Sequence, residues 1–473
     1  MNDGRYQRLS QLDRSFLVYE GPTAPMHVGA TALFAAAPLR NDAGGVDFAR
    51  IEEAVAARLH RIPRYRQRLA WTPLERHPIW VDDPDFQLRY HLRHTRLPRP
   101  GGERQLKRTA ARIFSQHLDR HRPLWELWVI EGLEEDRFAL VTKVHHCMID
   151  GVSGADLLAA LLSDAPLEKP EAPPAWVPEP PPDGARLARD TVVRALRTPL
   201  DLAGAAWQAA RDPRTLGGQV EARLAAIGRM VTGGLGPAPP TPFNQPIGPY
   251  RRVDWLAMDL PLVRRTAKAL GGTVNDLVLA TVAGGVRRFL GRQRQEDVER
   301  LDFRVLAPVS TRAAAERGRL GNRVSAWIVR LPLDERDDQR CFERIRATTA
   351  DLKGAHAELA AETLAQLTEW TGPLLLELGA RLMNVGASPF QMVVTNVPGP
   401  RNALYLLEAP MLAVHPMLPL LGTLGAGIAL FSYRDVLSWG FTADWDLVPD
   451  LHDFVGAVEA SFARLCRAAG TAD

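Results

Sequence analysis

The hydrophobic pattern of residues 1–165 alternates between strand-like and helical segments. Trp128–Leu133 and Phe138–Val144 are apolar and rich in β-branched residues, which predicts two paired strands. Apolar residues recur at helical spacing over Phe48–Leu59 and Arg104–Leu118, which predicts two amphipathic helices. Strands and helices that alternate along a chain are typical of an α/β domain.

A similar alternation resumes after residue 250. The predicted strands are Asp254–Leu260, Phe303–Val309, Ser325–Leu331, Gln391–Thr395, Ile428–Tyr433 and Leu437–Ala443, and the predicted helices are Pro261–Leu270, Thr273–Leu290, Cys341–Lys353 and Leu451–Leu465. Thr273 and Asp276 form a capping-box-like start for one of these helices. Because 473 residues are too many for one ordinary core, the two similar halves predict two α/β domains.

A segment of different composition separates the two halves. Residues 166–184 are proline-rich, which is typical of an extended linker. Ala185–Met230 returns to helical spacing, with apolar residues interleaved with arginines, which predicts one or two basic amphipathic helices. These helices either cover the domains with a solvated arginine face or hold the protein at an anionic lipid surface. We therefore expect domains over 1–165 and 251–473, joined by a linker over 166–250.

Composition limits the class of protein and its partners. The chain has 46% hydrophobic and 24% charged residues, as globular proteins do, and its net charge of +3 is too small to favour nucleic acid as a partner. Three widely spaced cysteines and an N-terminus without an export pattern predict a cytoplasmic protein. No window of about 18 uninterrupted apolar residues occurs, so we expect any contact with lipid to be peripheral.

The segment 145–151, with the sequence HHCMIDG, carries the clearest chemistry in the chain. It follows a predicted strand, and Asp-Gly favours a turn at the strand end. Adjacent strand residues point to opposite faces, so only one of the two histidines can face a cleft there. A neutral imidazole can take a proton from an alcohol near pH 7. Asp150 is a candidate for orienting that imidazole or for pairing with a buried arginine, and Gly151 permits a positive φ.

Other interpretations of this segment have less support. A lone histidine is more often a buried strand residue, but four fixed residues in register are rare by chance. A zinc site is disfavoured because adjacent strand histidines diverge and the chain lacks a Cys-x-x-Cys pair. Cys147 occupies a variable position and is expected to pack. Gly151–Ala155 resembles a nucleophile elbow, but Ala155 stands where glycine is required.

The segment 145–151 matches the HHxxxDG signature of the CoA-dependent acyltransferase superfamily, which includes chloramphenicol acetyltransferase-like enzymes and peptide-synthetase condensation domains. With further segments, the chain resembles the bacterial wax ester synthase/diacylglycerol acyltransferase family. Those segments are Pro25–Gly29, Pro123–Trp125, Ile130–Gly132, Asn275–Asp276 and Thr395–Pro400. The resemblance runs from about Leu9 to about Arg464, and the ordered set is more specific than HHxxxDG alone.

This resemblance implies a fold and a reaction. The fold would be two chloramphenicol-acetyltransferase-like α/β domains that form a tunnel. The reaction would transfer a long-chain acyl group from acyl-CoA, as co-substrate, to diacylglycerol or a fatty alcohol, with no metal or redox cofactor. His146 would be the general base because the superfamily uses the second histidine. Asn275 would face it from the second domain and, with Thr395, would stabilise the oxyanion.

The resemblance also suggests residues that bind substrate. Glu20 and Trp125 match positions that recur in the family, and Trp125 is expected to pack along the acyl tunnel. Asn396 ends a predicted strand before a rigid Pro-Gly-Pro turn, where its amide is a candidate donor to substrate. Alternatively, these residues have only a structural role: Asn275 near a helix cap, and Thr395 and Asn396 before a turn. His27 is a minor candidate for a second base.

Two other functions stay open from the sequence. A related acyltransferase takes its acyl group from a carrier protein, as condensation-type domains do. A catalytically silent lipid-droplet or scaffold protein could keep the fold, although the intact HHxxxDG segment argues against that. We expect peripheral association with the inner face of the membrane or with lipid droplets, through Ala185–Met230 or else through the apolar stretch Pro410–Leu421.

Overall fold

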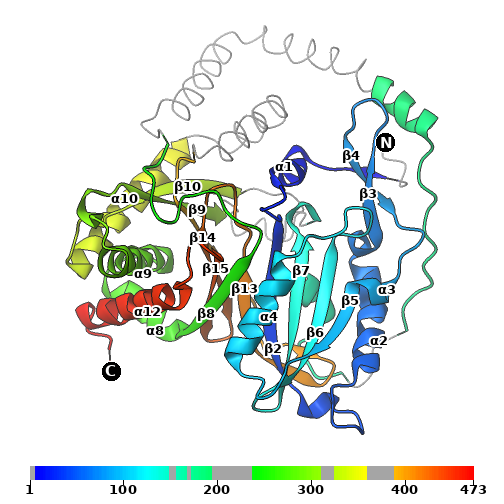
Figure 1. The fold of residues 1–473 in the computed structure, drawn as a ribbon, viewed down its shortest axis with the longest axis horizontal. Coiled ribbons are helices and arrows are strands. Elements are labelled where there is room, and N and C mark those ends of the chain that lie inside the picture. Colours follow the sequence, from blue (N-terminus) through cyan, green and yellow to red (C-terminus); the bar gives the residue numbers. More distant parts are fainter. Residues whose placement is uncertain are drawn as a thin grey trace.

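The structure, a computed structural model, describes residues 6–148, 156–167, 172–193, 237–310, 324–358 and 388–472. Two six-stranded sheets lie side by side, and helices pack against each of them (Figure 1). This arrangement confirms the predicted α/β fold with two sheet-rich domains.

The first sheet has the strand order β12-β13-β2-β7-β6-β5. Its strands are β2 (His27–Ala35), β5 (Leu92–Arg96), β6 (Trp125–Leu133), β7 (Arg137–His145), β12 (Tyr405–Leu406) and β13 (Ala409–Met417). Only β5 and β6 run parallel among these neighbours. The helix α2 (Phe48–Arg58) covers one face, where Val55 packs with Phe34. The helix α4 (Glu103–Ser115) covers the other face, where Ile113 packs with Leu33.

The second sheet has the strand order β10-β9-β11-β14-β15-β8. Its strands are β8 (Arg251–Asp259), β9 (Phe303–Ser310), β10 (Val324–Leu331), β11 (Met392–Val397), β14 (Ala426–Tyr433) and β15 (Val436–Asp444), and its helices are α8 (Leu260–Ala269), α9 (Val274–Arg288), α10 (Asp338–Glu358) and α12 (Leu451–Ala468). Thr273 Oγ1 and the Asp276 carboxylate make the predicted capping box at the start of α9. The periodicity therefore predicted the strands and helices of the second sheet correctly, to within about five residues at their ends.

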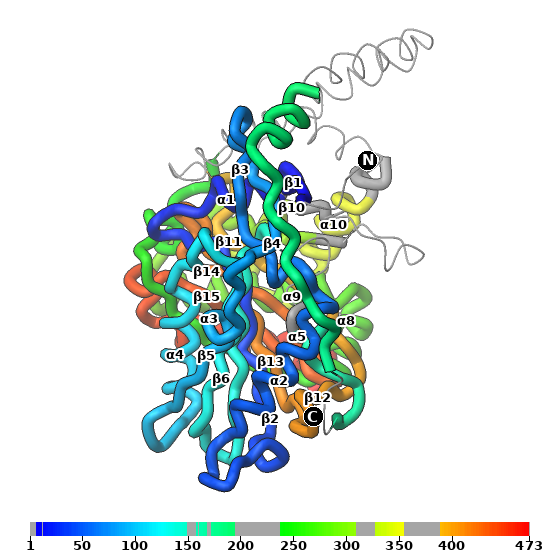
Figure 2. The backbone as a smooth tube through the Cα atoms, turned by 90° about the vertical axis from the view of Figure 1, so that its right-hand side faces the viewer, coloured from blue at the N-terminus to red at the C-terminus, as the bar shows by residue number. Residues whose placement is uncertain are grey.

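Smaller elements surround the first sheet. They are the three-stranded sheet of β1 (Gln7–Arg8), β3 (Gln67–Trp71) and β4 (Pro78–Asp82), and the helices α1 (Gln11–Tyr19), α3 (Leu88–His91) and α5 (Asp156–Leu161). Figure 2 shows residues 172–193 running along the side of this domain past β4. The proline-rich part is extended as predicted, and Leu187 in the helical stretch that follows packs with Ile79 and Val81. The rest of the predicted basic helices, from residue 194 on, lies outside the described residues.

Strands β12 and β13 come late in the chain but complete the first sheet, where β13 pairs antiparallel with β2. The first domain therefore combines the N-terminal part of the chain with residues 405–417, although the expected boundary at residue 251 coincides with the start of β8. The expectation that Pro410–Leu421 offers an apolar surface to lipid is wrong for most of the stretch. Met411, Val414, Met417, Leu418 and Leu420 are buried, and all of these except Leu418 belong to hydrophobic clusters inside the protein.

Candidate active site

The HHxxxDG segment begins where β7 ends. His145 is the last residue of that strand, and a 3₁₀ turn follows over His146–Met148. The backbone N–H of His146 donates to the carbonyl of Met26 at 2.8 Å, which fastens the turn to the start of β2. Asp150 and Gly151 lie outside the described residues, so their expected roles stay predictions.

The two histidines differ in what their ring nitrogens contact. His145 is buried, and its Nδ1 accepts the backbone N–H of Cys147 at 3.1 Å. A nitrogen that accepts an N–H carries no proton, so Nε2 is the protonated nitrogen of His145. That nitrogen lies 3.5 Å from Oε2 of Glu20. His145 therefore closes the turn and has no nitrogen left to serve as a base.

His146 is placed differently. Its half-buried imidazole stacks on the ring of Phe16 from α1, with centroids 3.8 Å apart and an angle of 21° between the rings. Its Nδ1 has no hydrogen-bond partner among the described residues. Burial lowers the pKa of His146 to about 4, so the ring is neutral at physiological pH. A neutral imidazole held by stacking is the state that a general base requires.

The carboxylate of Glu20 lies beside this turn. Glu20 is the C-cap of α1, and its side chain is 5% exposed. Burial alone would raise the pKa of Glu20, but contacts with His145 and Arg120 outweigh it and hold that pKa well below its usual range. The structure therefore places Glu20 next to the histidines as an anion, while its expected contact with substrate stays a prediction.

Trp125 is fully buried at the start of β6. Its indole N–H donates to the carbonyl of Tyr65 at 2.8 Å, and its ring stacks on His91 with centroids 4.8 Å apart. These contacts place Trp125 in the core of the first domain, in keeping with a packing role. A contact with the acyl chain stays a prediction.

The structure brings together two of the predicted residues in the second domain. Nδ2 of Asn396 on β11 donates to Oδ1 of Asn275 in the first turn of α9 at 2.8 Å. Thr395 precedes Asn396 on the same strand and is half-buried. Since adjacent strand residues alternate, Thr395 and Asn396 point to opposite faces of the sheet. The expectation that Asn275 faces His146 across the domains stays a prediction.

The remaining candidates near the motif are buried. Burial raises the pKa of the Cys147 thiol well above its ordinary value, which agrees with a packing role and disfavours a thiolate nucleophile. His27 lies opposite His145 across β2 and β7, and burial lowers its pKa well below the usual value. Within the described ranges, no group of three His, Cys, Asp or Glu residues is arranged to hold a metal ion.

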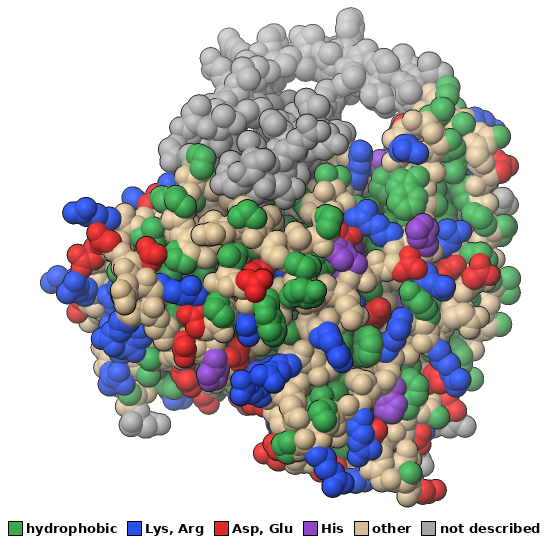
Figure 3. All heavy atoms as spheres, viewed as in Figure 1, with side chains coloured by type: hydrophobic (Ala, Val, Ile, Leu, Met, Phe, Trp, Pro, Cys, Tyr) green, Lys and Arg blue, Asp and Glu red, His purple; other side chains and the backbone are tan. Residues whose placement is uncertain are grey.

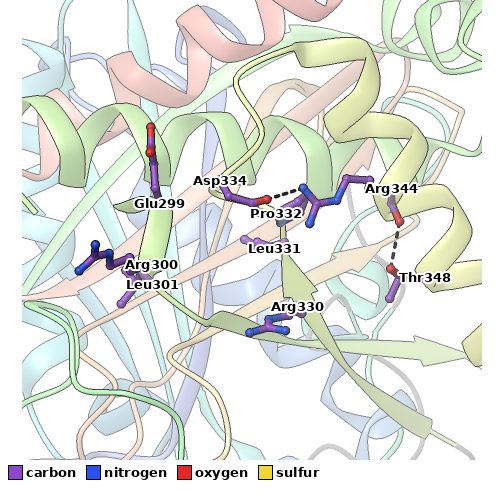
Figure 4. Close-up of a pocket in the computed structure, with 9 residues that line it drawn as sticks. All are labelled: Glu299, Arg300, Leu301, Arg330, Leu331, Pro332, Asp334, Arg344 and Thr348. Atoms are coloured by element: carbon purple, nitrogen blue, oxygen red, sulfur yellow. Dashed lines mark hydrogen bonds and ion pairs between the residues drawn. The ribbon is translucent and has the colours of Figure 1, made fainter. Parts of the chain in front are cut away.

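A separate pocket lies on the second domain, as shown in Figure 4. Its lining includes none of the residues predicted for the site. The arginines in it are matched by carboxylates: Arg344 pairs with Asp334 at 2.7 Å and Arg330 with Asp302 at 2.6 Å.

No helix in the described part of the chain is by itself long and apolar enough to cross a membrane. One bent pair, Leu260–Ala269 with Val274–Gln293, has the required length and composition, with a bend of 93° between its halves. Both halves contribute buried side chains such as Val263 and Val282 to the core of the second domain. The pair therefore resembles the core helices of a globular domain.

Sequence comparisons agree with the motifs. The wax ester synthase/diacylglycerol acyltransferase catalytic domain matches residues 9–278, and the corresponding C-terminal domain matches residues 320–466. A protein of Mycobacterium tuberculosis named as a diacylglycerol O-acyltransferase is 33% identical over 455 residues, which cover 94% of this chain and 87% of that protein. A similarly named protein of Mycobacterium bovis is 32% identical over 421 residues, which cover 87% of this chain and 86% of that protein.

Solved structures share the fold. The wax ester synthase/diacylglycerol acyltransferase of Marinobacter aquaeolei superposes with a TM-score of 0.71 at 26% identity, covering 98% of this chain and 100% of that one. A trichothecene 15-O-acetyltransferase from Fusarium sporotrichioides has a TM-score of 0.62 at 12% identity, covering 98% of this chain and 96% of that one, which shows the fold alone. The family models and relatives span most of the sequence and match the motifs above. The chain therefore belongs to the wax ester synthase/diacylglycerol acyltransferase family.

Proposed function

We propose that this protein transfers a long-chain acyl group from acyl-CoA to the hydroxyl of diacylglycerol or of a fatty alcohol, with His146 as the general base. The observation that carries the proposal is the state of His146. The ring is neutral, it is held against Phe16, and its Nδ1 has no partner among the described residues. The family, whose members are O-acyltransferases, supplies the class of reaction.

The proposed reaction proceeds in one complex of enzyme, donor and acceptor. The imidazole of His146 takes the proton of the acceptor hydroxyl as its oxygen attacks the thioester carbonyl carbon. The new C–O bond gives a tetrahedral oxyanion, which collapses as the C–S bond breaks. The CoA thiolate then takes the proton from the imidazolium, which restores neutral His146. The transfer needs no acyl-enzyme, in agreement with the buried, protonated thiol of Cys147.

The oxyanion needs hydrogen-bond donors, and Asn275 is the proposed source of one. Its Oδ1 accepts from Asn396, so Nδ2 is the atom of that side chain that can donate to substrate. Because the pair joins α9 to β11, Asn275 is held before substrate arrives, which is the condition for effective charge stabilisation. The family resemblance suggests the hydroxyl of Thr395 as a second donor, although on β11 Thr395 points to the opposite face from Asn396.

An acceptor panel tests this function. Purified protein is mixed with palmitoyl-CoA and with dioleoylglycerol, hexadecanol or no acceptor, thiol release is followed, and the lipids are separated by class. We expect acceptor-dependent thiol release and formation of triacylglycerol, wax ester or both. Thiol release that no acceptor raises above the acceptor-free control would refute the proposal.

We also propose that the protein collects its water-insoluble substrates at a lipid surface. On the face shown in Figure 3, basic and acidic side chains are interspersed rather than gathered into one basic area. The arginines of the segment 185–230 are the proposed source of attraction to an anionic surface. In the described start of that segment, Leu187 packs on the domain while Arg189, Val192 and Val193 are exposed.

Replacing Arg186, Arg189, Arg194 and Arg197 by Gln is expected to weaken binding to anionic liposomes in a salt-sensitive way, because each arginine near such a surface contributes about 1 kcal/mol. Turnover of short-chain, soluble substrates should not change. The measurement is liposome flotation at low and high salt. A matched control replaces four exposed arginines elsewhere by Gln: Arg89, Arg96, Arg300 and Arg336. If the first variant floats with liposomes as well as wild type does, the segment does not bind lipid and only covers the domain.

A further inference from the structure

We propose that Glu20 is a positioning residue, which holds the turn of His146 in place through the backbone of Met26. This inference rests on the proposed role of His146 as the base. It assigns to Glu20 a role in orienting that base, instead of the contact with substrate that the family resemblance suggests.

The carboxylate of Glu20 is a buried acceptor with well-defined partners. Arg120 donates to Oε2 from Nε at 2.9 Å and from Nη2 at 2.6 Å. The backbone N–H of Met26 donates to Oε1 at 3.3 Å. Both oxygens are therefore engaged by groups that are far apart in the sequence.

Met26 connects this carboxylate to the turn of the base. Its N–H is bound by Glu20, and its carbonyl accepts the backbone N–H of His146 at 2.8 Å. One peptide segment thus bridges Glu20 and His146. Removing the acceptor for the Met26 N–H frees the strand start to which His146 is fastened.

The carboxylate also supports the end of the helix that carries Phe16, the ring that stacks on His146. Glu20 is the C-cap of α1, where its backbone N–H, which does not depend on the side chain, donates to the carbonyl of Phe16 at 3.1 Å. Arg120 donates in addition to the carbonyl of Leu17 at 3.1 Å, so the Glu20–Arg120 pair holds the last turn of α1. Phe16 lies in that turn, which means that Glu20 supports both the backbone and the ring contact of His146.

A third contact runs through His145. Its protonated Nε2 lies 3.5 Å from Oε2 of Glu20, while its Nδ1 binds the N–H of Cys147 inside the turn. Two more imidazoles, of His117 and His27, lie 3.5 and 3.6 Å from Oε1. The contacts with His145 and Arg120 favour the ionised carboxylate, and the bond from Cys147 to Nδ1 links His145 to the backbone after His146.

These contacts favour a positioning role for Glu20 over a role in substrate binding. The side chain of Glu20 is 5% exposed, and each of its oxygens already accepts a hydrogen bond from a protein group, so the carboxylate serves the protein and is largely screened from substrate. A positioning role predicts a loss in kcat, because a base displaced by about 1 Å transfers its proton poorly. A binding role predicts a rise in KM with kcat unchanged.

The test compares two Glu20 variants with wild type. Glu20→Gln replaces one carboxylate oxygen by an NH2 group, so either Met26 or Arg120, which bind different oxygens, loses its acceptor. Glu20→Asp keeps the charge for Arg120 but is one methylene too short to reach Met26 as well. For both, kcat with palmitoyl-CoA and hexadecanol should fall about tenfold or more, with KM for palmitoyl-CoA within about twofold. Amide hydrogen exchange over residues 24–28 and 144–148 should speed up.

The matched control is Asp338→Asn, which breaks a carboxylate–arginine pair of the same kind in the second domain, where Arg464 donates at 2.7 and 2.6 Å. It should leave kcat and the exchange of both segments unchanged. Wild-type kcat in Glu20→Asp, or a raised KM with normal kcat, would overturn the positioning role. An inactive wild-type protein would refute the proposed function instead, while unchanged exchange in both Glu20 variants would still overturn the positioning role.

Discussion

His146→Ala is expected to release thiol from palmitoyl-CoA at least about a hundredfold more slowly than wild type, with either diacylglycerol or hexadecanol as acceptor. The variant loses the only group proposed to take the acceptor proton. It also loses the stacking on Phe16, but it keeps the hydrogen bond from the backbone of residue 146 to Met26. Thiol release at equal folded fraction is the measurement.

Two other histidines serve as comparisons. His60 is exposed, and its Nδ1 contacts the carbonyl of Ala57 in the first domain, so His60→Ala makes the same substitution away from the motif and should keep wild-type turnover. His145→Ala should lower stability as well as activity, because it leaves the N–H of Cys147 without its acceptor. Wild-type turnover in His146→Ala at equal folded fraction would rule out the proposed base.

The second large effect is acid unfolding driven by buried histidines. His91 stacks on Trp125, and His415 stacks on Trp255 with its Nδ1 2.7 Å from the hydroxyl of Ser438. Burial lowers the pKa of His91 to about 4 and that of His415 to about 3. Both rings are therefore neutral in the folded protein over a range in which the unfolded chain binds protons.

The sign follows from linkage. An unfolded histidine has a pKa of about 6.5, so the unfolded state binds more protons than the folded state below that pH. The stability from each ring is present above about pH 6.5 and is lost as the pH falls towards the folded pKa of about 4 for His91 and about 3 for His415. Between pH 7 and pH 5 each histidine removes about 2 kcal/mol from the free energy of unfolding.

Urea unfolding at pH 7 and pH 5 measures this loss. Wild type should lose about 4 kcal/mol from these two groups, and His415→Gln should lose about 2 kcal/mol less than wild type, since it no longer titrates at that position. The control is His121→Gln, whose side chain is 90% exposed and which should not change the pH dependence. An identical loss in His415→Gln and wild type would show that His415 titrates normally in the folded protein.

Much of the fold was readable from local patterns. The helix α9 shows helical spacing and its capping residues in sequence, and β14 and β15 show strand patterns on either side of a short turn. Such elements carry their own signals, because one face of each must be apolar. The repeat of this pattern in both halves of the chain was sufficient to predict two domains.

Strands β2 and β13 were not predicted as strands, for a physical reason. The stretch Ala409–Met417 contains two prolines and a histidine, which break both periodicities. It becomes a strand because β2 offers it a partner and because the histidine stacks on Trp255 across the domains. Pairing between segments almost 400 residues apart leaves no signal in either segment alone.

In the candidate site, too, local sequence predicted some features, while contacts between distant residues determined the others. The HHxxxDG segment located the turn, but the strand parity of the pair could not choose between its histidines. The choice of His146 as the base depends on the hydrogen bond from the backbone N–H of Cys147 to Nδ1 of His145, which is visible only in the structure of the turn. Likewise, the residues around Glu20 do not reveal that its carboxylate pairs with Arg120, which lies 100 residues further along the chain.

The central claim is direct transfer of the acyl group from CoA to an acceptor hydroxyl that His146 deprotonates. The most direct test is rapid mixing of excess enzyme with labelled palmitoyl-CoA, first without acceptor and then with hexadecanol, while thiol, ester and protein-bound label are followed. Direct transfer predicts no thiol and no label on the protein until the acceptor is added, and then one thiol for each ester formed. A burst of thiol before the acceptor, with the acyl group bound to the protein, would contradict the account.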